Sequence, residues 1–180
     1  MAGNDLEENS LYIMLFLRSH PPIPNDFHWA FYFHRGPNDG MKYHVRQQGN
    51  SGWMADHGAT AGVMKGFLLV GLFKIGDVPA DLKEHIDGIM RAYDDKLNVS
   101  DVICTCRIWL LWILTLLQTP IGGKRILRTD DLKALEDEVK TWGNENAIGA
   151  SNNEQPRPIA VSSILYIPED QDECRRALGG

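Results

Sequence analysis

A run of apolar residues from Ile108 to Leu117 limits the folds that are open to this chain. The run is about half as long as a helix that crosses a bilayer, so it predicts a helix buried in a protein core. Several bulky apolar residues and one cysteine share a stripe at helical spacing. The members of this stripe are Cys106, Trp109, Leu110, Ile113 and Leu117. We therefore expect the fold to be organised around this helix.

Cys106 lies in the first turn of the predicted helix, for which Ser100 or Asp101 is the candidate N-cap. Backbone N–H groups in a first turn lack partners, and the helix dipole favours a negative charge there. A thiol at this place is biased toward the thiolate, which attacks carbonyl groups. Cys104 is a competing nucleophile but is expected just outside the helix, whereas Cys106 is in register with Trp109. The alternative is that Cys106 is a small buried core residue.

Length and composition indicate one domain over residues 1–180, with residues 1–9 and 169–180 as disordered tails. The net charge of −6 makes a nucleic-acid partner unlikely. Three cysteines do not form a disulfide framework, and this favours a reducing, cytoplasmic setting. The acidic, polar start of the chain is not a signal peptide, and no segment is long enough to span a membrane. The sequence does not indicate an oligomeric state.

The remaining elements follow from periodicity and turn residues. Strands are expected at 11–17, 27–33 and 41–46, with a hairpin turn at 35–40 and a further strand or hairpin within 60–75. Helices are expected at 82–94 and 132–142, then a polar loop at 143–158 and a last strand at 159–167. The order of the elements, with strands first, then a block of helices and finally one strand, predicts an α+β fold.

Two histidines lie on neighbouring predicted strands. Alternation places His28 on one face of its strand with Ala30 and Tyr32. His28 is the candidate general base, and His44 on the returning strand is the candidate residue that orients it. Both histidines also have a structural alternative, as ordinary strand residues. A zinc site of His28, His44 and the two nearby cysteines is a further alternative, although only one residue separates those cysteines. The other histidines, His20, His34, His57 and His85, show no useful pattern.

Three segments carry a resemblance to a known family. They are His28-Trp29-Ala30-Phe31-Tyr32, Tyr43-His44-Val45 and Thr105-Cys106-Arg107-Ile108-Trp109. They resemble motifs of the lecithin:retinol acyltransferase-like proteins and the related phospholipase A/acyltransferases, within residues 27–118. These proteins have a circularly permuted papain-like (NlpC/P60-type) fold. The resemblance implies an antiparallel sheet packed against a cysteine-bearing helix, with Cys106 as nucleophile, His28 as base and His44 as orienting residue.

The chain departs from the family pattern at three points. Thr105 stands where the family has asparagine, the hairpin between the two histidines is longer, and the hydrophobic C-terminal anchor of the animal acyltransferases is missing. The last departure removes most of the reason to expect a membrane-lipid substrate.

The expected function is cysteine-dependent acyl transfer from an ester, thioester or amide through an acyl-cysteine intermediate. No cofactor or metal is expected, and the substrate is a small molecule or an acyl compound. Four aromatic residues are candidates for lining its pocket: Trp29, Tyr32, Trp53 and Trp109. One alternative is acyl or aminoacyl transfer to an amine in small-molecule biosynthesis. An alternative of another class is a catalytically silent module that binds a ligand or partner on the same fold.

Overall fold

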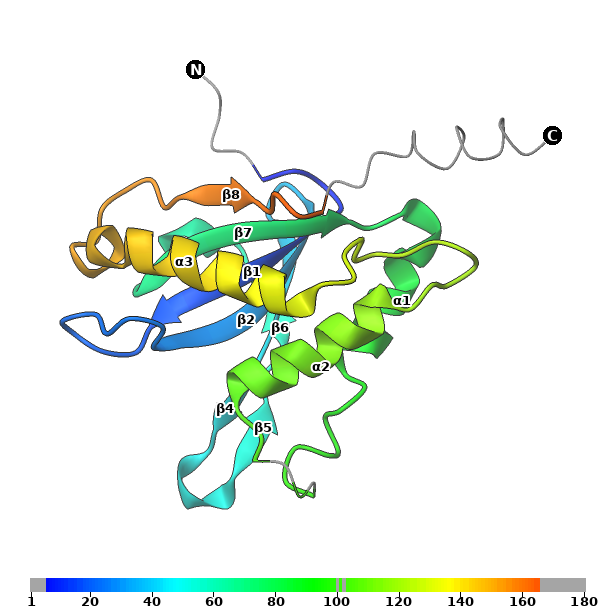
Figure 1. Cartoon of the computed structure of the whole chain (residues 1–180), viewed down its shortest axis with the longest axis horizontal. Helices are drawn as coiled ribbons and strands as arrows, with labels where there is room; N and C mark the ends of the chain where they lie inside the picture. Colours follow the sequence, from blue (N-terminus) through cyan, green and yellow to red (C-terminus); the bar gives the residue numbers. More distant parts are fainter. Residues whose placement is uncertain (1–5, 100, 102, 166–180) are drawn as a thin grey trace.

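The computed structural model describes residues 6–99, 101 and 103–165 (Figure 1). Within these residues six strands form one sheet in the order β6-β3-β2-β1-β7-β8, and β4 pairs separately with β5. The strands are β1 (Ser10–Leu17), β2 (Phe27–Gly36), β3 (Asp39–Tyr43), β4 (Val45–Gln47), β5 (Trp53–Ala55), β6 (Gly58–Ala59), β7 (Leu69–Asp77) and β8 (Ile159–Val161). The helices are α1 (Lys83–Met90), α2 (Cys106–Gln118) and α3 (Leu132–Ser151), with short 3₁₀ turns η1 (Gly49–Ser51), η2 (Val63–Lys65) and η3 (Ala80–Leu82).

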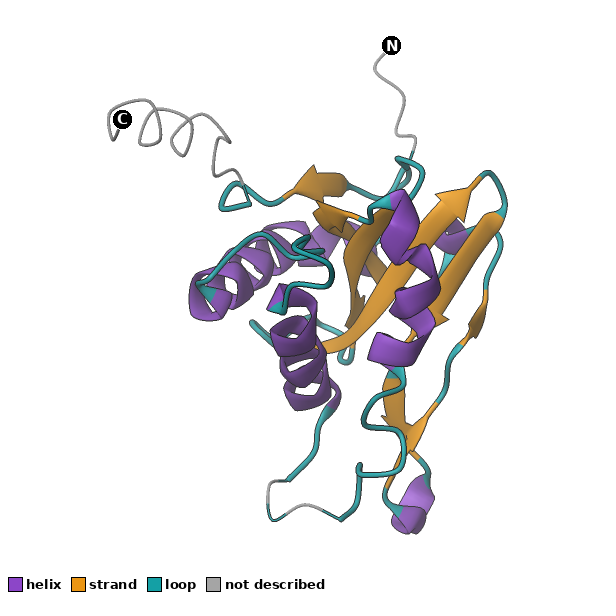
Figure 2. Cartoon of the chain, turned by 90° about the vertical axis from the view of Figure 1, so that its right-hand side faces the viewer, coloured by secondary structure: helices purple, strands orange, loops and turns teal. Residues whose placement is uncertain are grey.

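This architecture confirms the α+β prediction. The central strand β1 pairs antiparallel with both β2 and β7, and only the pairing of β7 with β8 is parallel within the described sheet. Figure 2 shows α2 and α3 against one side of the sheet. No helix in the described ranges has both the length and the apolar character needed to cross a bilayer.

The two faces of the sheet bury different clusters because side chains alternate along each strand. Trp29 and Phe31 of β2 point into the larger cluster, which includes the buried faces of α2 and α3. Ala30 and Tyr32 belong to a smaller cluster on the opposite face, which is covered by η2. The predicted alternation along β2 is therefore confirmed for these residues.

The first turn of α2 differs from the prediction in its cap. The helix begins at Cys106, and the hydroxyl oxygen of Thr105 accepts a hydrogen bond from the backbone N–H of Ile108 at 3.1 Å. Thr105 is thus the N-cap in place of Ser100 or Asp101, because only an oxygen directly before the first turn reaches its free donors. The predicted stripe from Cys106 to Leu117 is buried as expected.

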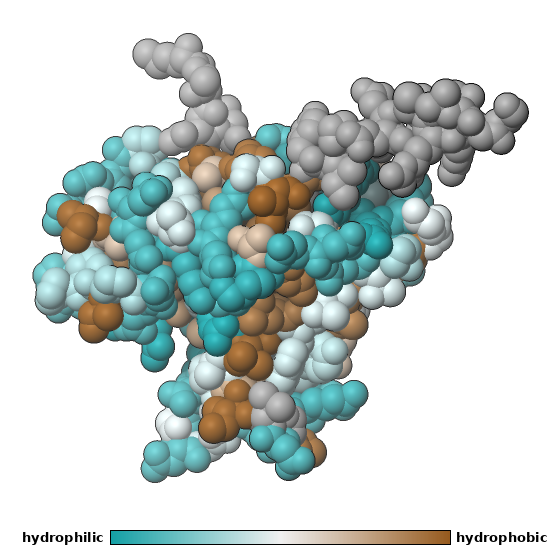
Figure 3. Space-filling model, viewed as in Figure 1, coloured by the Kyte–Doolittle hydropathy of each residue, from teal (hydrophilic) through white to brown (hydrophobic). Residues whose placement is uncertain are grey.

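Figure 3 shows further apolar surface in the middle of the face that carries α2 and α3.

Helix α3 is longer than predicted, since it continues through the segment expected to be a loop and ends at Ser151. Gly143 allows this, because a Cβ atom there would lie 2.6 Å from Leu15 and 3.0 Å from Phe27. A glycine that lowers local helix propensity therefore lets the helix pack closely on the sheet. At the C-terminal end the buried Arg157 guanidinium donates to the carbonyl oxygens of Ala150 and Glu154.

The expectation of a disordered N-terminal tail fails for residues 6–9. The carboxylate of Glu7 pairs with the buried ammonium of Lys74 at 2.5 Å, and the carbonyl of Asn9 accepts from Val78 N–H at 2.7 Å. These long-range contacts cannot be read from a polar sequence. Residues 1–5 and the predicted tail at 169–180 lie outside the described residues. The strand predicted at 159–167 is shorter than expected, since β8 ends at Val161 and residues 162–165 form no strand, while residues 166–167 are not described.

Candidate functional site

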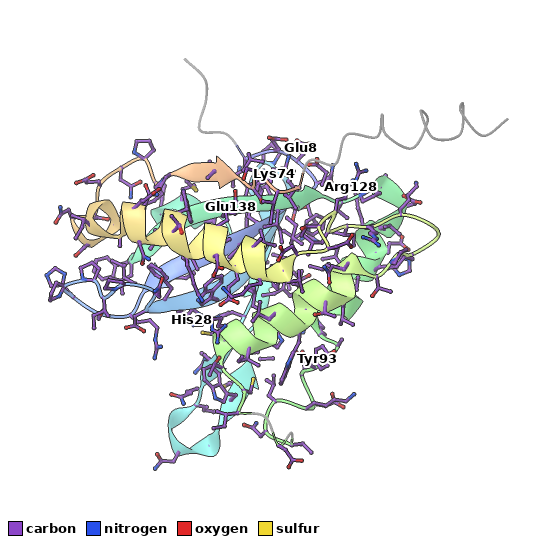
Figure 4. The ribbon with its side chains drawn as sticks, viewed as in Figure 1. Glu8, His28, Lys74, Tyr93, Arg128 and Glu138 are labelled. Carbon is purple, nitrogen blue, oxygen red and sulfur yellow. The ribbon has the colours of Figure 1, made fainter. Side chains whose placement is uncertain are left out.

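His28 and His44 form the centre of the candidate site. His28 lies near the start of β2, at the side of the molecule where α2 also begins (Figure 4), and His44 lies between β3 and β4. A hydrogen bond of 2.8 Å joins Nε2 of His28 to Nδ1 of His44. The structure therefore brings together the two histidines that the sequence singled out, although sixteen positions separate them along the chain.

Asp56 determines which of the two imidazoles donates. Its Oδ2 atom lies 3.5 Å from Nε2 of His44 and accepts a hydrogen bond from Arg46 at 2.8 Å. That hydrogen bond lowers the pKa of Asp56, so this residue is a carboxylate at neutral pH. A carboxylate favours the proton on the facing nitrogen of His44. Nδ1 of His44 is then an acceptor, His28 donates from Nε2, and the Nδ1 lone pair of His28 remains available.

Both imidazoles are neutral at physiological pH. Burial, reinforced by the charges of Lys42 and Arg18, lowers the pKa of His28 to about 4. Burial is also the main cause that lowers the pKa of His44 to about 3, followed by the charge of Lys42. Among the described residues Nδ1 of His28 has no hydrogen-bond partner. A neutral imidazole with one free nitrogen is the form that accepts a proton from a nucleophile.

Cys106 is the first residue of α2 and is 6% exposed within the larger cluster. Its helix packs on β2, where the rings of Trp109 and Phe31 have centroids 5.8 Å apart. His28 projects on the face of Ala30 and Tyr32, whereas Cys106 belongs to the cluster of Trp29 and Phe31. In the described part of the chain no hydrogen bond joins the sulfur of Cys106 to either imidazole.

The start of α2 carries the donors that an oxyanion needs. Thr105 uses its side-chain and backbone oxygens to accept from the N–H groups of Ile108 and Trp109. The N–H groups of Cys106 and Arg107 have no acceptor among the described residues. The Arg107 guanidinium donates to Glu136 of α3 at 2.7 Å, which holds this first turn against its neighbour helix.

Cys104 has a different environment. It is buried, its sulfur lies 3.8 Å from the carbonyl oxygen of Thr105, and burial raises the pKa of its thiol. A raised pKa lowers the fraction of reactive thiolate, so Cys104 is the weaker candidate nucleophile. The described residues contain no group of three or more histidine, cysteine or acidic side chains that could hold a metal ion. The zinc alternative therefore has no support from the geometry.

His57 is a histidine with a buried side chain that sequence reasoning missed. Its Nδ1 accepts a hydrogen bond from the backbone N–H of His44 at 3.1 Å, and its Nε2 lies 3.0 Å from Asp94. The ring stacks on Trp109 with a centroid distance of 5.9 Å, and its side chain is 1% exposed. His57 thus links His44 to α2 and to the segment after α1. Its loop position in the sequence carries no spacing signal that could have identified it.

The four aromatic residues predicted to line a pocket occupy different environments. Trp29 and Trp109 are fully buried in the larger cluster, and Tyr32 is buried in the smaller one. Trp53 is half-buried, and the Asn98 side chain holds its backbone through two hydrogen bonds of 2.8 and 2.7 Å. Core packing therefore accounts for the burial of Trp29, Tyr32 and Trp109.

Comparison with known proteins gives no relative, because no protein-family model, no curated protein and no solved structure matches this chain. The family resemblance of the three motifs stays a prediction.

Proposed function

We propose that this protein is a cysteine-dependent acyl-transfer enzyme in which Cys106 is the nucleophile and His28 the general base. The observation that carries the proposal is the 2.8 Å hydrogen bond between His28 and His44, with Asp56 beyond it. This chain of groups orients the His28 ring and leaves its Nδ1 lone pair free. A base oriented by a second and a third group is the arrangement that activates cysteine and serine nucleophiles.

In the proposed reaction Nδ1 of His28 takes the proton of the Cys106 thiol as the sulfur attacks the carbonyl carbon of an ester, thioester or amide. The N–H groups of Cys106 and Arg107 stabilise the negative oxygen that forms. The bond to the leaving group then breaks, and His28 returns its proton to that group. Water or an amine attacks the resulting acyl-cysteine, with His28 again as base, and the thiol is regenerated.

The proposal makes one geometric demand. Proton transfer takes place at hydrogen-bond distance, so the sulfur of Cys106 must come within about 4 Å of Nδ1 of His28 in the reactive state. Because His28 and Cys106 lie on opposite faces of the sheet, a rotamer change cannot supply this approach, and the first turn of α2 has to move around the end of β2.

Thiol alkylation tests the proposal, and Cys104 is the internal control two residues away. We expect iodoacetamide at neutral pH to label Cys106 at least about tenfold faster than Cys104, because in the proposed mechanism His28 assists the Cys106 thiol. His28→Ala should remove this advantage, whereas His85→Ala, on the exposed side of α1, should not change it. Mass spectrometry of the labelled peptides gives both rates. Equal, slow labelling of the two cysteines in the native protein would overturn the enzyme proposal and favour a silent binding module.

A further inference from the structure

Lys42 is a cationic residue on the same face of the sheet as the histidine pair. It belongs to β3 and pairs in register with Tyr32, whose side chain lies in the smaller cluster. Its ammonium lies 4.6 Å from the centroid of the Phe16 ring, and that ring is 6.0 Å from the ring of His28. Lys42 and Phe16 therefore adjoin the imidazole that carries the free nitrogen.

Within the described part of the chain the positive charge of Lys42 is not neutralised by an ion pair. Among the described residues no carboxylate lies within 4.0 Å of its ammonium. The nearby carboxylate of Asp56 is bound by Arg46 and faces His44. Arg18, the other cation that acts on His28, differs because it already pairs with Asp26 at 3.1 Å.

The half-buried position of Lys42 has an electrostatic consequence. Burial lowers the pKa of its ammonium, since the charged form has lost part of its hydration. The same charge acts on both imidazoles and disfavours their protonation. An anion placed here would recover the interaction that Lys42 lacks, through a charge-assisted hydrogen bond.

We propose that Lys42 binds an anionic group of the substrate, a carboxylate or a group of similar charge that lies close to the reacting carbonyl. This inference rests on the proposed function, in which the Cys106 sulfur approaches His28 and so reaches the face of the sheet that carries Lys42. It names the substrate class as an acyl compound that carries a negative charge near the bond to be broken. The Phe16 ring beneath the ammonium would pack against the adjoining hydrocarbon part.

Two alkylating agents of nearly equal size test the proposal. Iodoacetate and iodoacetamide both form a sulfur–carbon bond and release iodide, but only iodoacetate carries a carboxylate. We expect the iodoacetate-to-iodoacetamide rate ratio to be about tenfold higher at Cys106 than at Cys104, the effect of one charge-assisted contact. Lys42→Met keeps the length and apolar stem of the side chain and should bring the two ratios together. Lys42→Arg keeps the charge and should retain the preference.

A measurement that does not depend on cysteine reactivity separates the two proposals. Titration of the native protein with succinate should shift the NMR resonances of the His28 ring in a saturable manner, whereas neutral succinamide should not. In Lys42→Met the response to succinate should be lost while the native spectrum elsewhere is kept. Fast labelling of Cys106 without anion preference, together with no succinate response, would overturn the role of Lys42 alone. Slow labelling with a succinate response would overturn the proposed nucleophile and keep the anion site.

Discussion

The histidines His28 and His57 differ in how their ring nitrogens are used. Both nitrogens of His57 are engaged, one by the backbone N–H of His44 and the other by Asp94, and its ring is stacked on Trp109. His28 uses one nitrogen to contact His44 and keeps the other free among the described residues. A buried histidine with both nitrogens satisfied stabilises a structure, whereas one free nitrogen in an oriented ring supplies a base.

His44 connects these two networks. The imidazole of His44 lies between Asp56 and His28 and contacts both. The backbone N–H of His44 donates to His57. The second network therefore fixes the position of the strand segment that orients the first. The comparison separates residues whose loss should change the chemistry from residues whose loss should change the fold, and the following variants test that separation.

The largest effect is expected when the free nitrogen is removed. His28→Gln should lower acyl-transfer turnover by roughly a hundredfold to ten-thousandfold, the contribution of a positioned general base. The variant should keep its thermal unfolding temperature within a few degrees, because glutamine can still reach the His44 ring. Steady-state hydrolysis of a p-nitrophenyl ester gives the activity, and differential scanning calorimetry gives the stability. Unchanged turnover would remove His28 from the proposed mechanism.

The structural network should respond in stability first. His57→Gln keeps a donor for Asp94 but loses the acceptor for the His44 N–H, and His57→Asn does the reverse. Each variant leaves a buried polar group unpaired, which should lower the free energy of unfolding by about 1–3 kcal/mol. Only His57→Gln should also reduce turnover, because it releases the His44 backbone. Urea unfolding and ester hydrolysis, measured on both variants, distinguish this pattern from a role of His57 as the base.

Asp56→Asn tests the direction of the hydrogen bonds between the two imidazoles. An amide at this position can donate to Nε2 of His44, which would move the His44 proton to Nδ1 and leave His28 with its proton on Nδ1. We expect about tenfold lower turnover, the effect of a misplaced proton on an otherwise intact base. Stability should change little, since the Asp56 side chain is 47% exposed. Nitrogen-15 NMR of the imidazoles should report the exchange of tautomers, and Asp39→Asn on the exposed hairpin should leave it unchanged.

The last prediction concerns the pH dependence of stability, not turnover. Burial lowers the pKa of His28 and His44 in the folded state to about 4 and about 3, below the ordinary value of 6.5. Between pH 6.5 and 4 the unfolded chain therefore binds more protons, and the free energy of unfolding should fall as the pH falls. Replacing both histidines by glutamine should flatten this dependence between pH 6.5 and 5, where few carboxylates titrate. An equally steep profile in the double variant would contradict the neutral, partly buried state of the pair.

Local periodicity made much of the fold predictable. The alternation of β2 and the helical stripe from Cys106 to Leu117 depend only on which residues are apolar, because each pattern has one regular structure that buries it. The length of α3 could not be predicted in the same way. Gly143 reads as a helix breaker in sequence, and its close approach to Leu15 and Phe27 exists only once the sheet has formed. The role of His57 was likewise hidden, since its partners lie 13 and 37 positions away.

The sequence by itself determined an α+β chain, a buried helix that starts near Cys106, and His28 on a strand that is followed by a hairpin leading to His44. These features depend on local hydrophobic patterns and turn residues, which act over a few positions of the chain. Only the tertiary structure decided that His28 and His44 share a hydrogen bond, that Asp56 faces that pair, and that Lys42 stands beside it without an ion pair to any described carboxylate. The physical reason is that hydrogen bonding, burial and charge compensation depend on distances between segments, which are set only when the sheet and its helices pack together.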